Sequence, residues 1–240
     1  MEQTLLKKNK AVVGRFAAVL IYAIAMGYLE SAVVIYLRET AFGNTVQFFP
    51  LAFMEPRLGQ IEFIREAATI VMLLTIGFLA GKNIFQRCMF FVFSFAVWDI
   101  FYYLFLLIFT GWPSSLSDFD VLFLIPVIWI SPVAAPVLIS VLLATTSTIL
   151  IFMSEATAFK CRLSSIGIRI FIIGAAIDFY SFTEQSFRIL FTRGIKGLEG
   201  FTPVSFDWLL FWIGFLLMSA ATAMIIMECH QGLKTGWQQD

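Results

Sequence analysis

Acidic side chains inside long apolar segments are the residues of this chain that could do chemistry. Residues 61–81 begin IEFIREAATIV, so Glu62, Arg65, Glu66 and Thr69 fall at positions i, i+3, i+4 and i+7. This spacing places the four side chains on one face of a helix. Because the rest of the segment is apolar, we expect this face to point inward. An arginine fork suits more than one carboxylate, so Arg65 is expected to bridge Glu62 or Glu66.

Asp99 lies in the middle of another apolar segment, in FAVWDIFYY, with Tyr102 and Tyr103 one turn later on the same face. A tyrosine hydroxyl can donate a hydrogen bond to a carboxylate, which is one way to satisfy a buried acid. A carboxylate at the centre of a membrane span costs about 2.5–3.5 kcal/mol even on insertion scales. We therefore expect Asp99 to face a wet cavity or the bundle interior and to have a functional role.

Other acidic residues extend this candidate site. Together the candidate ligand- or ion-binding residues are Glu30, Glu62, Arg65, Glu66, Asp99, Tyr102, Tyr103, Asp118 and Asp120. Such a pocket could hold a proton, a hard cation such as Mg²⁺ or Ca²⁺, or a small cationic solute, because oxygen ligands favour hard cations. Polar pairs also hold membrane helices together, at about 0.6–2 kcal/mol each. That structural role is an equal alternative for Glu30 and the Glu62–Glu66 face, and an ion pair with Arg188 or Arg65 is the favoured explanation of Asp178.

The composition excludes several classes of protein. The chain of 240 residues is 60% hydrophobic and only 13% charged, against about a quarter charged in soluble domains. We expect one integral membrane domain, residues 1–240, whose 28 phenylalanines mostly face lipid. A net charge of zero gives no support for a nucleic-acid partner. One histidine, His230, and three scattered cysteines disfavour haem, zinc and iron–sulfur centres, so no cofactor is expected beyond a hard cation.

The apolar segments predict an all-α, polytopic bundle of six transmembrane helices, since each approaches the roughly 20 residues that a span needs. Residues 121–154 carry no charge, and prolines at 126, 132 and 136 disfavour a continuous helix there. We expect a Pro-broken or re-entrant segment over 118–132, before the fourth span. Residues 185–205 are expected to form an interfacial amphipathic helix. The six predicted spans are roughly 12–37, 61–81, 88–111, 133–153, 165–184 and 206–227.

Lysine and arginine counts predict the orientation. With six spans and a cytoplasmic N-terminus, ten of the 16 basic residues fall on the inner side and six on the outer side. We therefore expect a cell-membrane protein with both termini in the cytoplasm. The candidate acids then lie between mid-membrane and the outer surface.

Three functions remain open. The first is an outward-facing acidic pocket that binds or translocates a proton, a cation or a small cationic solute. The second is a non-catalytic subunit or anchor of a membrane complex, with other membrane subunits or a second copy as partners besides the lipid bilayer. The third is an intramembrane enzyme acting on a lipid or isoprenoid, for which the DxD spacing of Asp118 and Asp120 is the nearest motif. No recognised catalytic motif occurs in a credible setting, which disfavours an enzyme.

Overall fold

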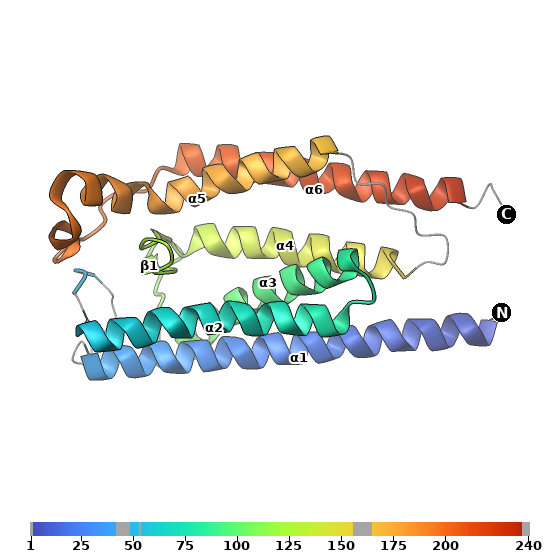
Figure 1. Ribbon diagram of the computed structural model, residues 1–240, viewed down its shortest axis with the longest axis horizontal. Coiled ribbons are helices and arrows are strands. Elements are labelled where there is room, and N and C mark those ends of the chain that lie inside the picture. The colour runs from blue at the N-terminus through green and yellow to red at the C-terminus, as the bar shows by residue number, and fades with distance from the viewer. Residues whose placement is uncertain (1, 42–48, 53, 156–164, 237–240) are drawn as a thin grey trace.

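The computed structural model describes residues 2–41, 49–52, 54–155 and 165–236, and its main elements are six long helices (Figure 1). All six are long and apolar enough to cross a membrane, so the predicted all-α bundle of six spans is confirmed. The helices are α1 (Glu2–Ala41), α2 (Pro56–Ala80), α3 (Ile84–Thr110), α4 (Ala134–Met153), α5 (Ser165–Arg193) and α6 (Trp208–Gly236).

The start of α1 and the end of α6 lie at the same end of the bundle, which we call the terminal end (Figure 1). An even number of spans requires this arrangement. Which side of a membrane the terminal end faces stays a prediction, and the predicted inner loop at 156–164 lies outside the described residues.

Local signals set the boundaries of α2 and α3. Proline at position 56 opens α2, where its missing N–H is not needed. The side chain of Asn83 accepts a hydrogen bond from the backbone N–H of Gln86 (2.9 Å) and so caps the start of α3. Gly111, with φ of 71°, ends α3 in the left-handed conformation that glycine adopts easily. Because the turn between α2 and α3 is short, these two helices pack against each other.

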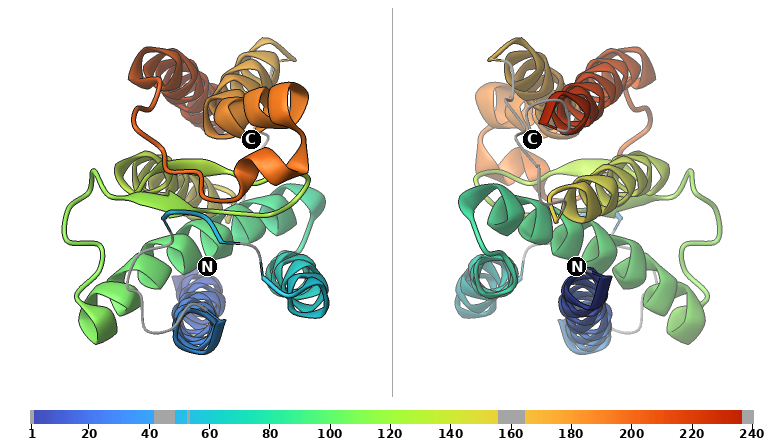
Figure 2. Two further views of the ribbon diagram at one scale, coloured as in Figure 1. Left: turned by 90° about the vertical axis from the view of Figure 1, so that its left-hand side faces the viewer. Right: turned by 90° about the vertical axis from the view of Figure 1, so that its right-hand side faces the viewer.

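Helix α3 occupies the middle of the bundle, because it packs against α1, α2 and α4 (Figure 2). Helices α5 and α6 form a separate pair that reaches the rest mainly through α4 and the strand β2 (Ile130–Pro132). Gly174 and Gly214 allow α5 and α6 to approach closely, because a Cβ at Gly174 would lie only 2.7 Å from the carbonyl oxygen of Gly214. The close helix contact expected of small residues is therefore present.

The proline-rich segment before α4 is not helical. Strands β1 (Phe119–Val121) and β2 pair antiparallel, with Asp120 opposite Ser131, and form a short hairpin. The indole N–H of Trp129 donates to the carbonyl of Ile125 (2.8 Å) and helps to close the connecting loop. The predicted break before the fourth span is thus present, and it takes the form of a β-hairpin. We call the end of the bundle that carries it the hairpin end.

The predicted amphipathic helix over 185–205 is wrong as a separate element. Helix α5 continues through 184 to Arg193 and ends at Gly194, whose φ of 65° stops it. A single 3-10 turn, η1 (Ile195–Leu198), follows. Of the basic residues that suggested a surface helix, Arg188 and Arg193 belong to the last turns of α5, and Lys196 lies in η1.

A cluster of polar side chains lies at the terminal end, around Glu155. Its carboxylate accepts hydrogen bonds from Arg15, from Lys82 Nζ (2.8 Å) and from Gln86 Nε2 (2.8 Å). Arg15 also donates to the carbonyl of Ala80 (2.5 Å). The cluster therefore ties α1, the turn between α2 and α3, α3 itself and the end of α4 together.

Candidate functional site

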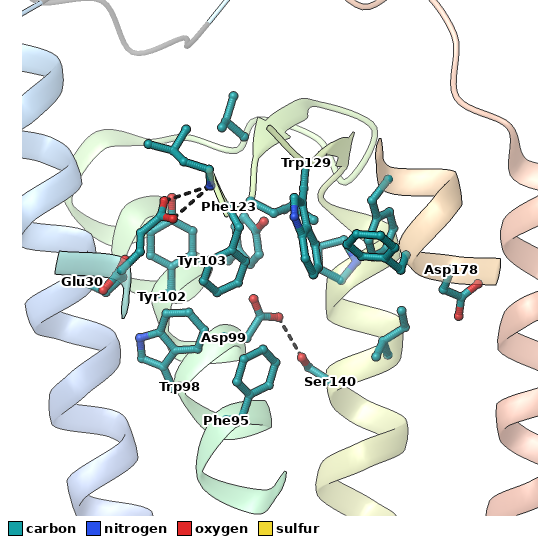
Figure 3. Close-up of a pocket in the computed structure, with 18 of the residues that line it drawn as sticks. Glu30, Phe95, Trp98, Asp99, Tyr102, Tyr103, Phe123, Trp129, Ser140 and Asp178 are labelled. Carbon is teal, nitrogen blue, oxygen red and sulfur yellow. Dashed lines mark hydrogen bonds between the residues drawn. The ribbon is translucent and has the colours of Figure 1, made fainter. Parts of the chain in front are cut away.

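A cavity of about 310 Å³ lies under the hairpin, between the helices of the bundle (Figure 3). It is lined from all six helices, with Met218 as the contribution of α6. Most of the candidate site lies on its wall: the lining includes Glu30, Glu62, Arg65, Glu66, Asp99, Tyr102 and Tyr103, seven of the nine candidates. Asp118 and Asp120 do not line it.

Arg65 joins two of the acids and two of the helices. Its Nη1 lies 2.5 Å from Glu30 on α1, and its Nε and Nη2 donate to Glu62 at 2.9 and 2.6 Å. Thr69 adds a hydrogen bond to Glu30 (3.3 Å). The face predicted to point inward is indeed buried at Glu62, Glu66 and Thr69. This Glu30–Arg65–Glu62 group, which we call the arginine clamp, satisfies both carboxylates and holds α1 against α2.

Arg65 bridges Glu62, one of its two predicted partners, and Glu66 is bound by the hairpin. Its carboxylate accepts the backbone N–H of Leu124 at 2.9 and 3.2 Å, instead of forming an ion pair with Arg65. Leu124 lies in the loop of the hairpin, so Glu66 fastens the hairpin to α2. The contact joins one wall of the cavity to the segment that covers it.

Asp99 points into the middle of the cavity, among the side chains drawn in Figure 3. One carboxylate oxygen accepts a hydrogen bond from the hydroxyl of Ser140 on α4 (2.8 Å). The expectation that Tyr102 and Tyr103 satisfy Asp99 is wrong, because the hydroxyl of Tyr102 donates to Asp120 (3.4 Å). One neutral hydroxyl therefore replaces the two predicted donors, and Asp99 has no ion pair among the described residues.

The two DxD carboxylates have separate partners. Asp118 caps its own exposed loop by accepting hydrogen bonds from Ser114 and Ser115 (2.8 and 3.2 Å). Asp120 is fully buried in β1, 3.6 Å from Arg38 on α1. Burial raises the pKa of Asp120 to about 6, although the charge of Arg38 opposes this shift. Asp120 thus anchors the hairpin, and the two DxD carboxylates do not form a joint site.

Asp178 is the acidic residue of the cavity that is missing from the nine predicted candidates. It lines the cavity from α5, is only 2% exposed, and has no hydrogen-bond partner for either carboxylate oxygen among the described residues. The expected ion pairs are not formed, because Arg188 pairs with Glu184, and Arg65 belongs to the arginine clamp. A Cβ on Gly214 would lie 2.1 Å from Asp178 Oδ1, so the carboxyl group packs against the backbone of α6.

Aromatic rings form a continuous wall around Asp99. The sequence analysis expected most phenylalanines to face lipid, but the phenylalanines of this wall line the cavity. Successive ring centroids lie 5.3, 6.0, 5.4 and 4.9 Å apart along the series Phe95, Trp98, Phe123, Trp129 and Phe179. This aromatic wall runs from α3 across the hairpin to α5, and all five residues line the cavity. Only the pairing of the hairpin with the helices brings these distant residues together, so no local pattern could have shown it.

The chemistry of the cavity is that of a negatively charged, mostly apolar site. Five carboxyl groups and one guanidinium line it. The arginine clamp balances part of that charge, while Asp99 and Asp178 keep no counter-ion within the described part of the chain. Over those same residues, no three His, Cys, Asp or Glu side chains are grouped so as to hold a metal ion. No family model, curated protein or solved structure matches the chain.

Proposed function

We propose that this multi-pass membrane protein binds a cation in the cavity under the hairpin, with Asp99 as its principal carboxylate. The supporting observation is the excess of carboxyl groups over basic groups in this cavity. Five carboxyl groups face the cavity against one arginine, and that arginine is already engaged by Glu30 and Glu62. Buried carboxylates without counter-charge are costly in a membrane protein, so a proton or a ligand cation is needed to balance them.

The charge distribution indicates how the cation enters. The cavity is lined by residues of the hairpin, which lies at the end of the bundle away from the chain termini (Figure 1), and the basic-residue count predicts that this end faces outward. A cation from the outer solution would reach Asp99 after passing the hairpin. Binding there is the first step that either reception or translocation of the cation requires.

The arrangement of donors disfavours a bare hard metal ion. Ca²⁺ takes six to eight oxygen ligands and Mg²⁺ takes six. In this cavity the carboxylates of Glu30 and Glu62 bind Arg65, and that of Glu66 binds the backbone of the hairpin. The remaining two acids, Asp99 and Asp178, come from α3 and α5. A proton or a larger cation that needs fewer oxygen ligands fits this donor set better than Mg²⁺ or Ca²⁺.

Ligand-dependent thermal stability in detergent tests the proposal. A ligand that binds only the folded state stabilises it by RT ln(1 + [L]/Kd), which is about 2.7 kcal/mol at one hundred times Kd. We expect at least one ion of a panel containing Na⁺, K⁺, Mg²⁺, Ca²⁺, ammonium and ethylammonium, or a change of pH, to stabilise the wild type. Asp99→Asn should fold normally and lose that response.

The matched control is Asp118→Asn. This change removes an acid from the same end of the molecule but outside the cavity, so it should leave the response of the wild type intact. Identical responses of wild type and Asp99→Asn to every ion and to pH would refute the proposal.

A further inference from the structure

The aromatic wall indicates which kind of cation the cavity takes, and this inference rests on the proposed function. We infer that the ligand is a small organic ammonium ion with an aromatic or apolar body. Its charged group lies at Asp99, and its body lies against the rings of Trp98, Phe123 and Trp129. The ligand is thus defined by two features, a positive charge at one end and an apolar surface next to it.

Ring faces around a carboxylate are suited to an ammonium group. The faces of tryptophan, tyrosine and phenylalanine attract cations electrostatically, most strongly where water is excluded. In Figure 3, the Asp99 carboxylate lies between Phe95 and Trp98 on one side and Phe123 on the other. An ammonium group beside Asp99 would therefore meet a carboxylate and several ring faces at once.

The cation–π contacts found among the described residues lie outside the aromatic wall. They involve other aromatic residues, since Arg15 lies over Phe90, Arg38 over Trp112 and Arg87 over Phe78. Arg65, which lines the cavity, is held by its two carboxylates instead. The rings of the aromatic wall are therefore available to contact a ligand in the cavity.

The size and the second acid of the cavity agree with an organic ligand. A volume of about 310 Å³ is at the lower end of the roughly 300–1,000 Å³ of small-molecule sites, and it far exceeds the needs of one bare ion. Asp178 is an independent sign of a missing cationic partner, because it is 2% exposed, lines this cavity and has no hydrogen bond within the described ranges. An ammonium ligand would reduce the unbalanced charge that Asp99 and Asp178 create.

Phenethylammonium and its neutral analogue 2-phenylethanol separate charge from shape. The measurement is the thermal stability of the detergent-purified full chain as a function of probe concentration, with ammonium as the charged probe that lacks a body. We expect phenethylammonium to stabilise the wild type at concentrations at least about tenfold lower than ammonium, and 2-phenylethanol to have no comparable effect. Asp99→Asn should abolish the response to phenethylammonium.

Replacing one ring of the wall tests the cation–π contact. Phe123→Leu keeps an apolar side chain in the hairpin but removes the ring, and it should weaken phenethylammonium binding about three- to thirtyfold. Phe179→Leu provides the same test from α5 if the hairpin variant folds poorly. Phe109→Leu is the matched control, because this exposed ring lies on α3 outside the cavity and its loss should not change binding.

The outcomes distinguish the inference from the proposed function. Suppose that protons or inorganic ions give an Asp99-dependent effect but phenethylammonium binds no better than ammonium. That outcome would refute the inference of an organic ligand and support the proposed cation site. Equal effects of phenethylammonium and 2-phenylethanol, or unchanged binding in both ring variants, would also overturn the inference. If no cation and no pH change gives an Asp99-dependent effect, the proposed function fails and the inference fails with it.

Discussion

The two ends of the bundle use buried acids in opposite ways. At the terminal end, Glu155 is surrounded by Arg15, Lys82 and Gln86, so donors outnumber the single carboxylate. At the hairpin end, the acids outnumber the cations, and Asp99 receives one hydrogen bond from a serine. The same side-chain chemistry therefore holds helices together at one end and leaves negative charge available at the other. The difference lies in the surroundings of each acid, and this is what separates a structural acid from a candidate binding residue.

Two acids outside the spanning helices show the contrast as opposite pKa shifts. Burial alone would raise the pKa of Glu155, but the hydrogen bonds from Lys82, Arg15 and Gln86 outweigh it and hold that pKa below its usual value. Burial dominates at Asp120 and raises its pKa to about 6, despite Arg38. The surroundings of Glu155 thus favour its charged form, and those of Asp120 shift its equilibrium toward the neutral form.

Removing the cation of the arginine clamp should have the largest effect. Arg65→Ala leaves Glu30 and Glu62 without a counter-charge, so it should lower the free energy of unfolding by about 3 kcal/mol. Arg65→Lys should cost less. Because Glu66 is bound to the hairpin instead of to Arg65, Glu62→Gln should recover part of the loss, while Glu66→Gln should not. Detergent unfolding of the single and double mutants measures this coupling, and strictly additive losses would disprove the clamp.

The terminal end should respond nearly as strongly to loss of its acid. Glu155→Ala leaves Arg15 and Lys82 together without a carboxylate and should cost about 2 kcal/mol, since both cations are partly exposed. Glu184→Ala is the control, because its pair with Arg188 is exposed on one helix and should contribute less than about 0.5 kcal/mol. Similar losses in both variants would show that Glu155 is only a surface ion pair.

The pH dependence of stability should have opposite signs at the two ends. Asp120 binds its proton more tightly in the folded protein than in the unfolded chain, so its contribution falls as pH rises from about 4 to 6. The size of this fall is roughly 3 kcal/mol, because one pKa unit corresponds to about 1.4 kcal/mol. Glu155 loses its proton more readily when folded, so its contribution is present above the usual value of 4.5 and is lost as pH falls below it.

Two variants separate these contributions in thermal unfolding curves across pH. Asp120→Asn should flatten the decline between pH 4 and 6, and Glu155→Gln should remove part of the loss at lower pH. If both variants changed the curve in the same direction, the contrast between the two ends would be false.

The smallest change in the free energy of unfolding is expected for substitution of Asp178. Asp178→Asn replaces a buried carboxyl group that has no hydrogen bond within the described residues, so it should raise the unfolding free energy by up to about 1 kcal/mol without ligand. Detergent unfolding at pH 8 measures this, and Ser181→Ala, one turn away on α5, controls for the loss of a polar side chain. A loss of more than about 1 kcal/mol would show that Asp178 stabilises the fold through a contact of its own.

The sequence predicted the spans well because the membrane demands long apolar segments. It also predicted the break before α4, because prolines exclude a continuous helix there. It did not predict the hairpin, since the pairing of Asp120 with Ser131 depends on two segments eight residues apart that lack an alternating pattern. The extension of α5 to Arg193 was missed because Arg188, Arg193 and Lys196 among apolar residues suggested a separate surface helix.

The candidate site was predictable where it follows helical spacing and unpredictable where it depends on tertiary contacts. The i, i+3 pair of Glu62 and Arg65 was visible in the sequence, but the third member of the clamp, Glu30, comes from another helix. Ser140 carried no local signal, because a serine in an apolar helix usually bonds to its own backbone. The depth of Asp178 did mark it as unusual, yet its lack of a hydrogen bond to any described residue follows only from the packing of α5 against α6.

The bond that fastens the hairpin to α2 has a consequence for sequence variation. Glu66 accepts a backbone N–H, so any residue other than proline at position 124 can supply the same donor. Side chains in the hairpin loop can therefore change without releasing the loop from the helix. Related chains could then diverge at positions 123 and 124, where side chains meet the cavity, while Glu66 stays fixed. Ligand preference and loop attachment are in this way free to evolve separately.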